Sequence, residues 1–206
     1  MHKPLALLGL ILGAAALALQ LVVAVSAGGA EAAIGYVTSL LVIANLVAVL
    51  VYAGELTNAA ALSAFRTKGM QGMTATAMAF AMLFYHLVAA DQLHPEGLAL
   101  ISNVALGYVA PTLFVSYWMV YLTTGSLRLH HVAPWLLFPA LFICWTLLLG
   151  TVTGIYAYDV LNVAAEGWGA VAINYLTFIA AFLMLSVFAV GFDTEKKPTP
   201  DHAPQH

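Results

Sequence analysis

Long uncharged apolar stretches constrain the fold of this chain more than any other feature. Six of them can be drawn, and none has Asp, Glu, Lys or Arg in its central part. Each is about 20 residues or longer, the length that a helix needs to cross the hydrocarbon core of a bilayer. They cover residues 4–26, 33–53, 71–90, 98–124, 133–155 and 167–192. We therefore predict an all-α polytopic membrane protein with six transmembrane helices.

The composition argues against other classes of protein. Of the 206 residues, 63% are hydrophobic and 7% are charged, whereas soluble globular chains are about 25% charged. The six basic residues are scattered, so no basic stripe indicates nucleic-acid binding. Cys144 is the single cysteine, which rules out a disulfide framework. We predict no metal and no cofactor, because His86 is the one histidine clearly inside a span and no carboxylate accompanies it.

The basic residues predict the orientation of the chain. All six lie at chain ends or in loops that a six-span arrangement puts on one side: Lys3, Arg66, Lys68, Arg128, Lys196 and Lys197. Because cytoplasmic loops carry the excess of Lys and Arg, both termini are expected in the cytoplasm. The first stretch exceeds the 7–15 apolar residues of a signal peptide, so we expect a retained helix. We expect residues 1–192 to form one transmembrane domain and residues 193–206 a disordered cytoplasmic tail.

The fourth stretch contains a defect in its helical hydrogen bonding. Pro111 has no amide hydrogen, so the carbonyl of Gly107, four residues earlier, is expected to lose its partner. A kink at this point either only shapes the packing or exposes a carbonyl to a neighbouring helix, a water or a ligand.

Polar side chains of several spans fall at similar depths in the outer half of the predicted membrane domain. Thr38, Asn103 and His86 lie at this depth, with Gly107 and Asn45 deeper. Spans five and six add Thr151, Thr153 and Asn174. Two interpretations stay open: hydrogen bonding between helices, or the lining of a pocket next to the kinked helix. In the second interpretation His86 is a candidate base.

Residues 150–162, Gly-Thr-Val-Thr-Gly-Ile-Tyr-Ala-Tyr-Asp-Val-Leu-Asn, indicate a helix end, an aromatic anchor and an acidic outer loop. The segment also resembles the signature of the androgen-induced/androgen-dependent-regulator membrane family, and most closely its bacterial six-helix Pr-six-Pr branch. The resemblance extends to Phe-Tyr-His-Leu at 84–87, His-Pro-Glu-Gly at 94–97 and Pro-Trp-Leu-Leu-Phe-Pro at 134–139. It covers about residues 33–190 and implies a multi-pass protein of a bacterial cytoplasmic (inner) membrane.

The resemblance also implies a chemistry. Animal members of the family are intramembrane hydrolases that cleave fatty-acid esters of hydroxy fatty acids with a threonine nucleophile and a histidine. The threonine corresponds to Thr38, but the position of the histidine reads Gly107, and the Asp that precedes Trp in many bacterial members is Tyr117. Only His86 is left as a replacement base for the weakly nucleophilic threonine.

Two functions therefore stay open, with a preference for the first. One is a non-catalytic protein that binds membrane lipid or serves as an accessory subunit for other membrane proteins. The other is an intramembrane threonine hydrolase of lipid esters that uses Thr38 and His86. Gly9, Gly13 and Ala16 have the spacing of a close helix contact, either with a partner or within the chain.

Overall fold

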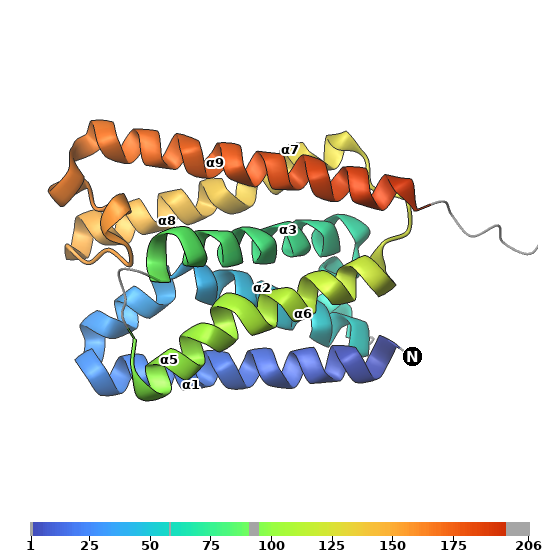
Figure 1. Cartoon of the computed structure of the whole chain (residues 1–206), viewed down its shortest axis with the longest axis horizontal. Coiled ribbons are helices and arrows are strands. Elements are labelled where there is room, and N and C mark those ends of the chain that lie inside the picture. The colour runs from blue at the N-terminus through green and yellow to red at the C-terminus, as the bar shows by residue number, and fades with distance from the viewer. Residues whose placement is uncertain (1, 58, 91–94, 197–206) are drawn as a thin grey trace, which may run out of the picture.

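The computed structural model describes residues 2–57, 59–90 and 95–196, and every regular element within them is helical. The long helices run side by side along one axis, and the N-terminus lies at the same end of the bundle as the end of α9 (Figure 1). The predicted all-α class is confirmed.

The first two predicted spans are joined by helix rather than by a loop. They form α1 (His2–Thr38) and α2 (Leu40–Leu56). Gly29 interrupts α1 with φ 58°, a left-handed conformation that glycine adopts without steric cost. A second break at Ser39 bends residues Glu31–Thr38 away from α2 by 59°. The chain therefore changes direction twice at this end of the bundle.

The small residues of α1 are used within the chain. A Cβ on Gly9 would come within 2.2 Å of the Tyr52 ring, and one on Gly13 within 2.8 Å of Val49. These glycines let α1 approach α2 closely.

The third predicted span forms the centre of the bundle. It follows η1 (Ala60–Arg66, a 3-10 helix) and consists of α3 (Lys68–Phe84), continued by the π-helix η2 (Tyr85–Ala89). Gln71, Thr74 and Thr76 of α3 are each at most 2% exposed. Gly72 makes room for the Trp135 ring, which a Cβ would meet at 2.8 Å. Protein therefore surrounds α3 on most of its sides.

The fourth span has the predicted irregularity at Pro111, in a different form. It is built from α5 (Gly97–Val104), the π-helix η3 (Ala105–Val109), α6 (Ala110–Tyr117) and the π-helix η4 (Trp118–Leu122). In η3 the Ala110 amide bonds the Ala105 carbonyl, five residues back. By this register the Leu106 carbonyl faces Pro111, which has no amide hydrogen. The π-turn therefore leaves the Leu106 carbonyl without a helical partner, and the expected loss at Gly107, four residues before Pro111, stays a prediction.

The remaining elements complete the bundle. They are η5 (Leu129–His131), α7 (Val132–Trp135), α8 (Leu137–Thr153), η6 (Asp159–Leu161) and α9 (Val163–Glu195). Because α9 continues through Glu195, the start of the predicted disordered tail at Asp193 was wrong, and residues 197–206 lie outside the described part. Asp193 is 2% exposed, and its carboxylate accepts hydrogen bonds from the Thr124 and Leu127 amides, each at 2.8 Å.

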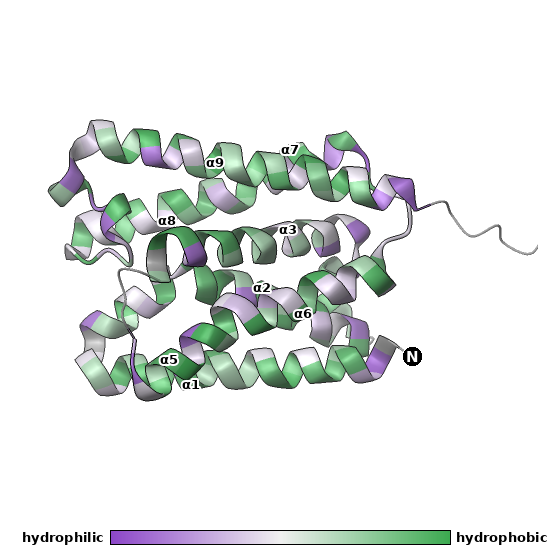
Figure 2. Cartoon of the chain, in the orientation of Figure 1, coloured by the Kyte–Doolittle hydropathy of each residue, from purple (hydrophilic) through white to green (hydrophobic). Residues whose placement is uncertain are grey.

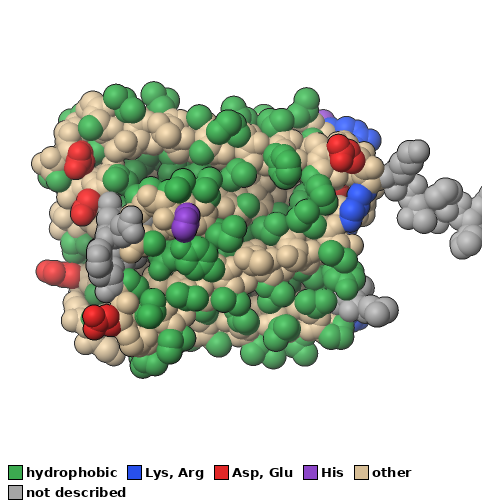
Figure 3. Space-filling view, viewed as in Figure 1, with side chains coloured by type: hydrophobic (Ala, Val, Ile, Leu, Met, Phe, Trp, Pro, Cys, Tyr) green, Lys and Arg blue, Asp and Glu red, His purple; other side chains and the backbone are tan. Residues whose placement is uncertain are grey.

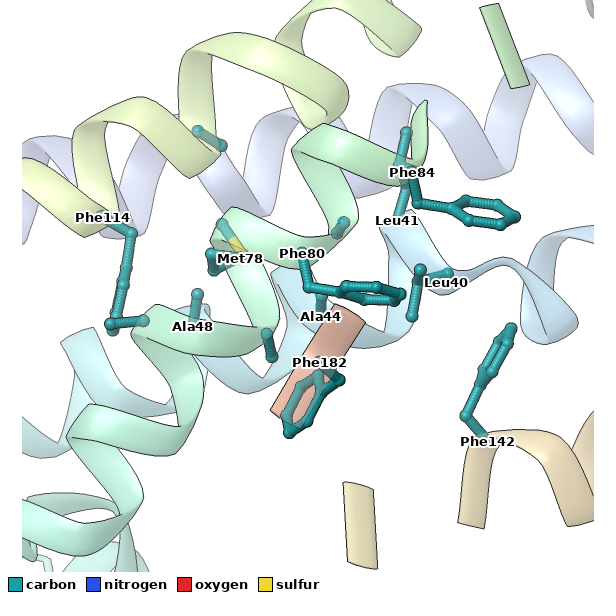
Figure 4. Close-up of a cluster of buried hydrophobic side chains, with 14 of the residues drawn as sticks. Leu40, Leu41, Ala44, Ala48, Met78, Phe80, Phe84, Phe114, Phe142 and Phe182 are labelled. Carbon is teal, nitrogen blue, oxygen red and sulfur yellow. The ribbon is translucent and has the colours of Figure 1, made fainter. Parts of the chain in front are cut away.

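Aromatic rings join α3, α8 and α9. Phe80 meets Phe178 edge-on with ring centroids 4.4 Å apart, and Phe142 stacks on Phe178 at 5.4 Å. Figure 4 shows Phe80, Phe84, Phe142 and Phe182 among the aliphatic side chains of α2 and α3. Such pairs add about 0.5–1.5 kcal/mol each to the burial of the rings, so this cluster fixes α3 against its neighbours.

Within the described residues, four helices are long and apolar enough to cross a membrane, or five if the bent pair counts as one span. They are Lys3–Gly29, Gly97–Leu122, Leu129–Thr153 and Val163–Glu195, with the pair Glu31–Thr38 and Leu40–Leu56. Figure 2 shows their apolar residues along the length of the bundle and polar ones toward its ends. These helices indicate a membrane-embedded protein and are compatible with a multi-pass one.

Candidate functional site

Thr38 is buried within the wall of the bundle. It is the last residue of α1, is 0% exposed, and donates its hydroxyl hydrogen to the carbonyls of Ile34 at 2.9 Å or Gly35 at 3.1 Å. Threonine in a helix commonly bonds a carbonyl three or four residues back in this way. The Thr38 hydroxyl hydrogen is therefore donated within its own helix.

His86 lies on the exposed surface of η2. Its Nδ1 is 3.1 Å from the Tyr108 hydroxyl. Within the described residues no hydrogen bond joins His86 to Thr38, although a nucleophile and its base need a separation of about 3 Å or one bridging water. The structure gives the two residues separate partners.

Asn45 supplies the hydrogen bond that Pro111 cannot. Its side chain is 1% exposed, and its Nδ2 donates to the Leu106 carbonyl at 2.9 Å and to the Leu41 carbonyl at 2.8 Å. The carbonyl freed in η3 is therefore satisfied by α2, which supports the interhelical interpretation of Asn45. Gly107 is packed under Tyr85, because a Cβ there would lie 2.5 Å from that ring.

The polar residues of spans five and six lie apart from the other predicted site residues. They are Thr151, Thr153 and Asn174. Both threonines are exposed, and their hydroxyls donate to carbonyls of their own helix, Leu147 at 2.7 Å and Leu149 at 2.6 Å. Asn174 donates to the Val160 carbonyl at 2.8 Å and lines a separate, apolar pocket. The expected convergence of these three residues on one pocket was wrong.

A polar cavity nevertheless lies where α1 bends. It has a volume of about 380 Å³ and is enclosed by the two parts of α1, the start of α2, η2, α5 and the segment that precedes η6. Its polar lining is Gln20, Glu31, Tyr36, Ser39, Tyr85, Asn103, Tyr156 and Tyr158. Asn103 is the one residue of the predicted polar layer in this lining.

Tyr158 and Trp145 satisfy backbone groups that the break at Ser39 leaves without helical partners. The Tyr158 hydroxyl accepts a hydrogen bond from the Leu40 amide at 3.2 Å and lies 3.2 Å from the Ser39 hydroxyl. The Trp145 indole donates to the Val37 carbonyl at 3.0 Å. The helix break, and with it the cavity wall, is therefore held by residues distant in sequence.

Burial raises the pKa of the Tyr158 phenol above its ordinary value, against a smaller lowering by the hydrogen bonds with Ser39 and Leu40. The phenol is therefore neutral across the physiological pH range, and it acts here as a hydrogen-bonding group rather than as a base.

Among the described residues, the hydrogen bonds of the lining leave two side-chain amide groups without a protein partner. Gln20 accepts from the Ser102 hydroxyl through its Oε1, which leaves its amide NH₂. Asn103 donates to the Ala99 carbonyl at 2.8 Å, which leaves its Oδ1. Among the described residues Glu31 has no ion-pair partner. The cavity thus offers one carboxylate, an amide donor and an amide acceptor.

An apolar groove adjoins this cavity between α1 and α2. It has a volume of about 250 Å³ and is lined by Leu17, Ala18, Leu21, Tyr36, Val37, Val42, Ile43 and Leu46. Tyr36 and Val42 line both spaces. Leu21 and Leu46 are 41% and 49% exposed, so the groove opens on the outer surface of the helices. The cavity and the groove are therefore neighbours that share two wall residues.

Charge differs between the two ends of the bundle. Figure 3 shows carboxylates gathered at one end and Lys and Arg at the other, where further carboxylates lie beside them. We call the first the acidic end; its described carboxylates are Glu31, Glu96, Asp159 and Glu166. Glu31 of the acidic end also lines the cavity. No group of three His, Cys, Asp or Glu side chains within the described residues is placed to hold a metal ion.

Comparison of the chain with protein-family models, curated proteins and solved structures finds no match.

Proposed function

We propose that this chain is a multi-pass protein of a bacterial cytoplasmic membrane that binds a membrane lipid at its acidic end without chemical turnover. The arrangement has six spans, with α3 as the central one and both termini in the cytoplasm. The distribution of basic residues supports this orientation. The described Lys and Arg residues lie at the end of the bundle opposite the cavity.

The observation that carries the lipid proposal is that the cavity, with its polar wall residues, and the apolar groove lie next to each other. A membrane lipid has a polar head joined to apolar chains, and these two spaces meet at Tyr36 and Val42. The head group enters the cavity of about 380 Å³, and a segment of one acyl chain lies along the groove between α1 and α2. Pockets for small ligands combine apolar walls with a few placed polar groups in the same way.

We favour this function over the threonine hydrolase that the family resemblance implies. The Thr38 hydroxyl donates to its own helix, and no described base accepts its proton. We also favour it over an accessory subunit held by the small residues of α1, because Gly9 and Gly13 already pack on α2.

The test fills the cavity from a position that tolerates a side chain. Gly35 lines the cavity, and a Cβ built on it meets nothing within 4 Å. We expect the wild-type protein, purified in mild detergent and examined by native mass spectrometry, to retain one lipid. Gly35→Phe should reduce this occupancy at least tenfold.

Gly169→Phe is the matched control. Gly169 also has nothing within 4 Å of a built Cβ, but it is exposed on α9 and does not line the cavity. It should leave the bound lipid in place. Equal lipid occupancy in the wild type and in Gly35→Phe would contradict the proposal.

A further inference from the structure

We propose that the cavity selects a head group that carries an ammonium cation, an inference that rests on the lipid-binding function proposed above. The first argument is charge. Among the described residues, Glu31 is the one charged side chain in the lining, and no Lys or Arg takes part in it. An anionic head group would meet a carboxylate with no compensating cation, whereas an ammonium group gains a counter-ion.

The acidic end strengthens this selection at longer range. Glu96, Asp159 and Glu166 lie at the same end of the bundle as Glu31. The described Lys and Arg residues lie at the opposite end of the bundle, where salt screens their effect on the cavity. The field at the cavity entrance therefore attracts cations and repels phosphate groups that lack a cationic partner.

The second argument is the aromatic lining. Tyr36, Tyr85, Tyr156 and Tyr158 all contribute to the wall. The Tyr36 hydroxyl donates to the Leu17 carbonyl at 3.1 Å, and the Tyr158 hydroxyl is engaged with Ser39 and Leu40. These two tyrosines therefore offer a ligand mainly their rings. Tyrosine rings attract alkylated ammonium groups through their negative faces, as in the aromatic cages that hold choline.

The remaining polar groups fit the neighbours of such a cation. Asn103 keeps its Oδ1 as an acceptor, which suits an N–H or a polarised methyl group on nitrogen. Gln20 keeps its amide NH₂, which can donate to a phosphate or ester oxygen of the same zwitterionic head group. One carboxylate, aromatic rings and a single amide donor thus match an ammonium next to an acceptor oxygen.

The experiment compares lipids with identical acyl chains and different head groups. Delipidated protein in maltoside detergent is titrated with phosphatidylcholine, phosphatidylglycerol and a neutral glycosyl diacylglycerol, and the dissociation constants are measured by native mass spectrometry. We expect phosphatidylcholine to bind at least tenfold more tightly than either of the others.

Two variants at the acidic end locate the preference. Glu31→Gln should reduce the preference for phosphatidylcholine over phosphatidylglycerol about fivefold or more. Glu166→Gln removes an exposed carboxylate that does not line the cavity, so it should leave most of the preference intact. Equal affinities for the three lipids, tighter binding of phosphatidylglycerol or the glycolipid, or an unchanged preference in Glu31→Gln would each overturn the assignment.

A last arm identifies the source of the ammonium group. Displacement of phosphatidylcholine by millimolar tetramethylammonium would show that the free cation is also a ligand, and retention of the lipid would assign the site to lipid head groups. Either outcome supports ammonium recognition when the lipid preference holds. If Gly35→Phe abolishes binding of all three lipids but the wild type binds them equally, lipid binding stands and the ammonium assignment fails. If Gly35→Phe changes nothing, both fail.

Discussion

The hydrogen bond from Asn45 to the Leu106 carbonyl allows a quantitative test of how the kinked helix is stabilised. The carbonyl is free because the π-turn η3 aligns it with Pro111. Asn45→Ala should therefore leave a buried acceptor without a partner. Interhelical hydrogen bonds in membrane proteins contribute about 0.6 kcal/mol on average and up to about 2. Because the buried carbonyl would have no other partner, we expect Asn45→Ala to lower the free energy of unfolding by about 1–2 kcal/mol, in the upper part of that range.

Pro111→Ala makes the prediction specific. The alanine restores an amide hydrogen that can reach the Leu106 carbonyl within the helix, so Asn45 becomes less important. In the Pro111→Ala background, Asn45→Ala should cost less than about 0.5 kcal/mol, because the carbonyl keeps a partner. The coupling free energy of this double-mutant cycle should be about 1 kcal/mol.

The assay is reversible unfolding in mixed detergent micelles, followed by circular dichroism for the four proteins of the cycle. Asn103→Ala is the matched control, because its amide bonds the Ala99 carbonyl of its own helix at 2.8 Å. Its effect should be the same with Pro111 or Ala at that position. Additive effects of Asn45→Ala and Pro111→Ala would refute the assignment of the freed carbonyl to Leu106.

Three further predictions follow from single contacts and a fourth from the distribution of Lys and Arg. Purified protein should not hydrolyse fatty-acid esters of hydroxy fatty acids, with or without Thr38→Ala, since the hydroxyl is committed to its own helix; hydrolysis lost on that change would contradict this. Asp193→Ala should lower the free energy of unfolding by about 3 kcal/mol, because the amides of Thr124 and the buried Leu127 lose a charged acceptor, whereas the exposed Glu195→Ala should cost less than about 0.5. Gly9→Leu should cost about 1–3 kcal/mol by overpacking against Tyr52, and Gly191→Leu, where a Cβ has open space, should be neutral in the same unfolding assay. Reporter fusions should give a cytoplasmic signal at Ala61 and a periplasmic one at Pro95; the reverse would refute the proposed orientation.

The presence of long helices could be predicted from the sequence, because a helix that crosses the bilayer needs a long uncharged apolar stretch. The backbone around Pro111 could be predicted only in part. The missing amide follows from the residue itself, but which carbonyl it leaves free depends on whether the preceding turn is α or π. That choice is made by packing: Gly107 lies under the Tyr85 ring, and Asn45 reaches the adjacent carbonyl.

The membership of the polar cavity was harder to predict, because rise per residue gives depth but not direction. Thr151 and Asn103 come at similar depths, yet the first is exposed and the second faces the cavity. Hydroxyls add a second difficulty, since Thr38 and Thr151 both bond carbonyls of their own helix. A polar residue in a span is thus a weak indicator of a pocket when its own helix can satisfy it.

The residues that sequence reasoning missed lie at helix breaks. Tyr156 belongs to the segment interpreted as an aromatic anchor, and Tyr36 and Glu31 were not predicted as site residues, but all three line the cavity beside the bend of α1. Gly29 was the available signal, since a glycine with positive φ permits a turn within helical sequence. The inward fold of Tyr158 had no comparable signal, because its partners on Ser39 and Leu40 are more than a hundred residues away.

The central position of α3 explains why a search by helix length and hydropathy finds fewer spans than the six that we propose. Hydropathy measures how well a helix surface suits lipid, and α3 presents little of its surface outside the protein: Leu83, at 40% exposure, is its one exposed large apolar residue. In α9, by contrast, Ile173, Met184 and Phe188 are each at least 64% exposed. A helix enclosed by its neighbours can bury Gln71 and Thr74, because the Gln71 amide NH₂ donates to Glu55 and the Thr74 hydroxyl donates to the Met70 carbonyl. The lower hydropathy of α3 is then a consequence of its central position. It is compatible with a helix that crosses the bilayer.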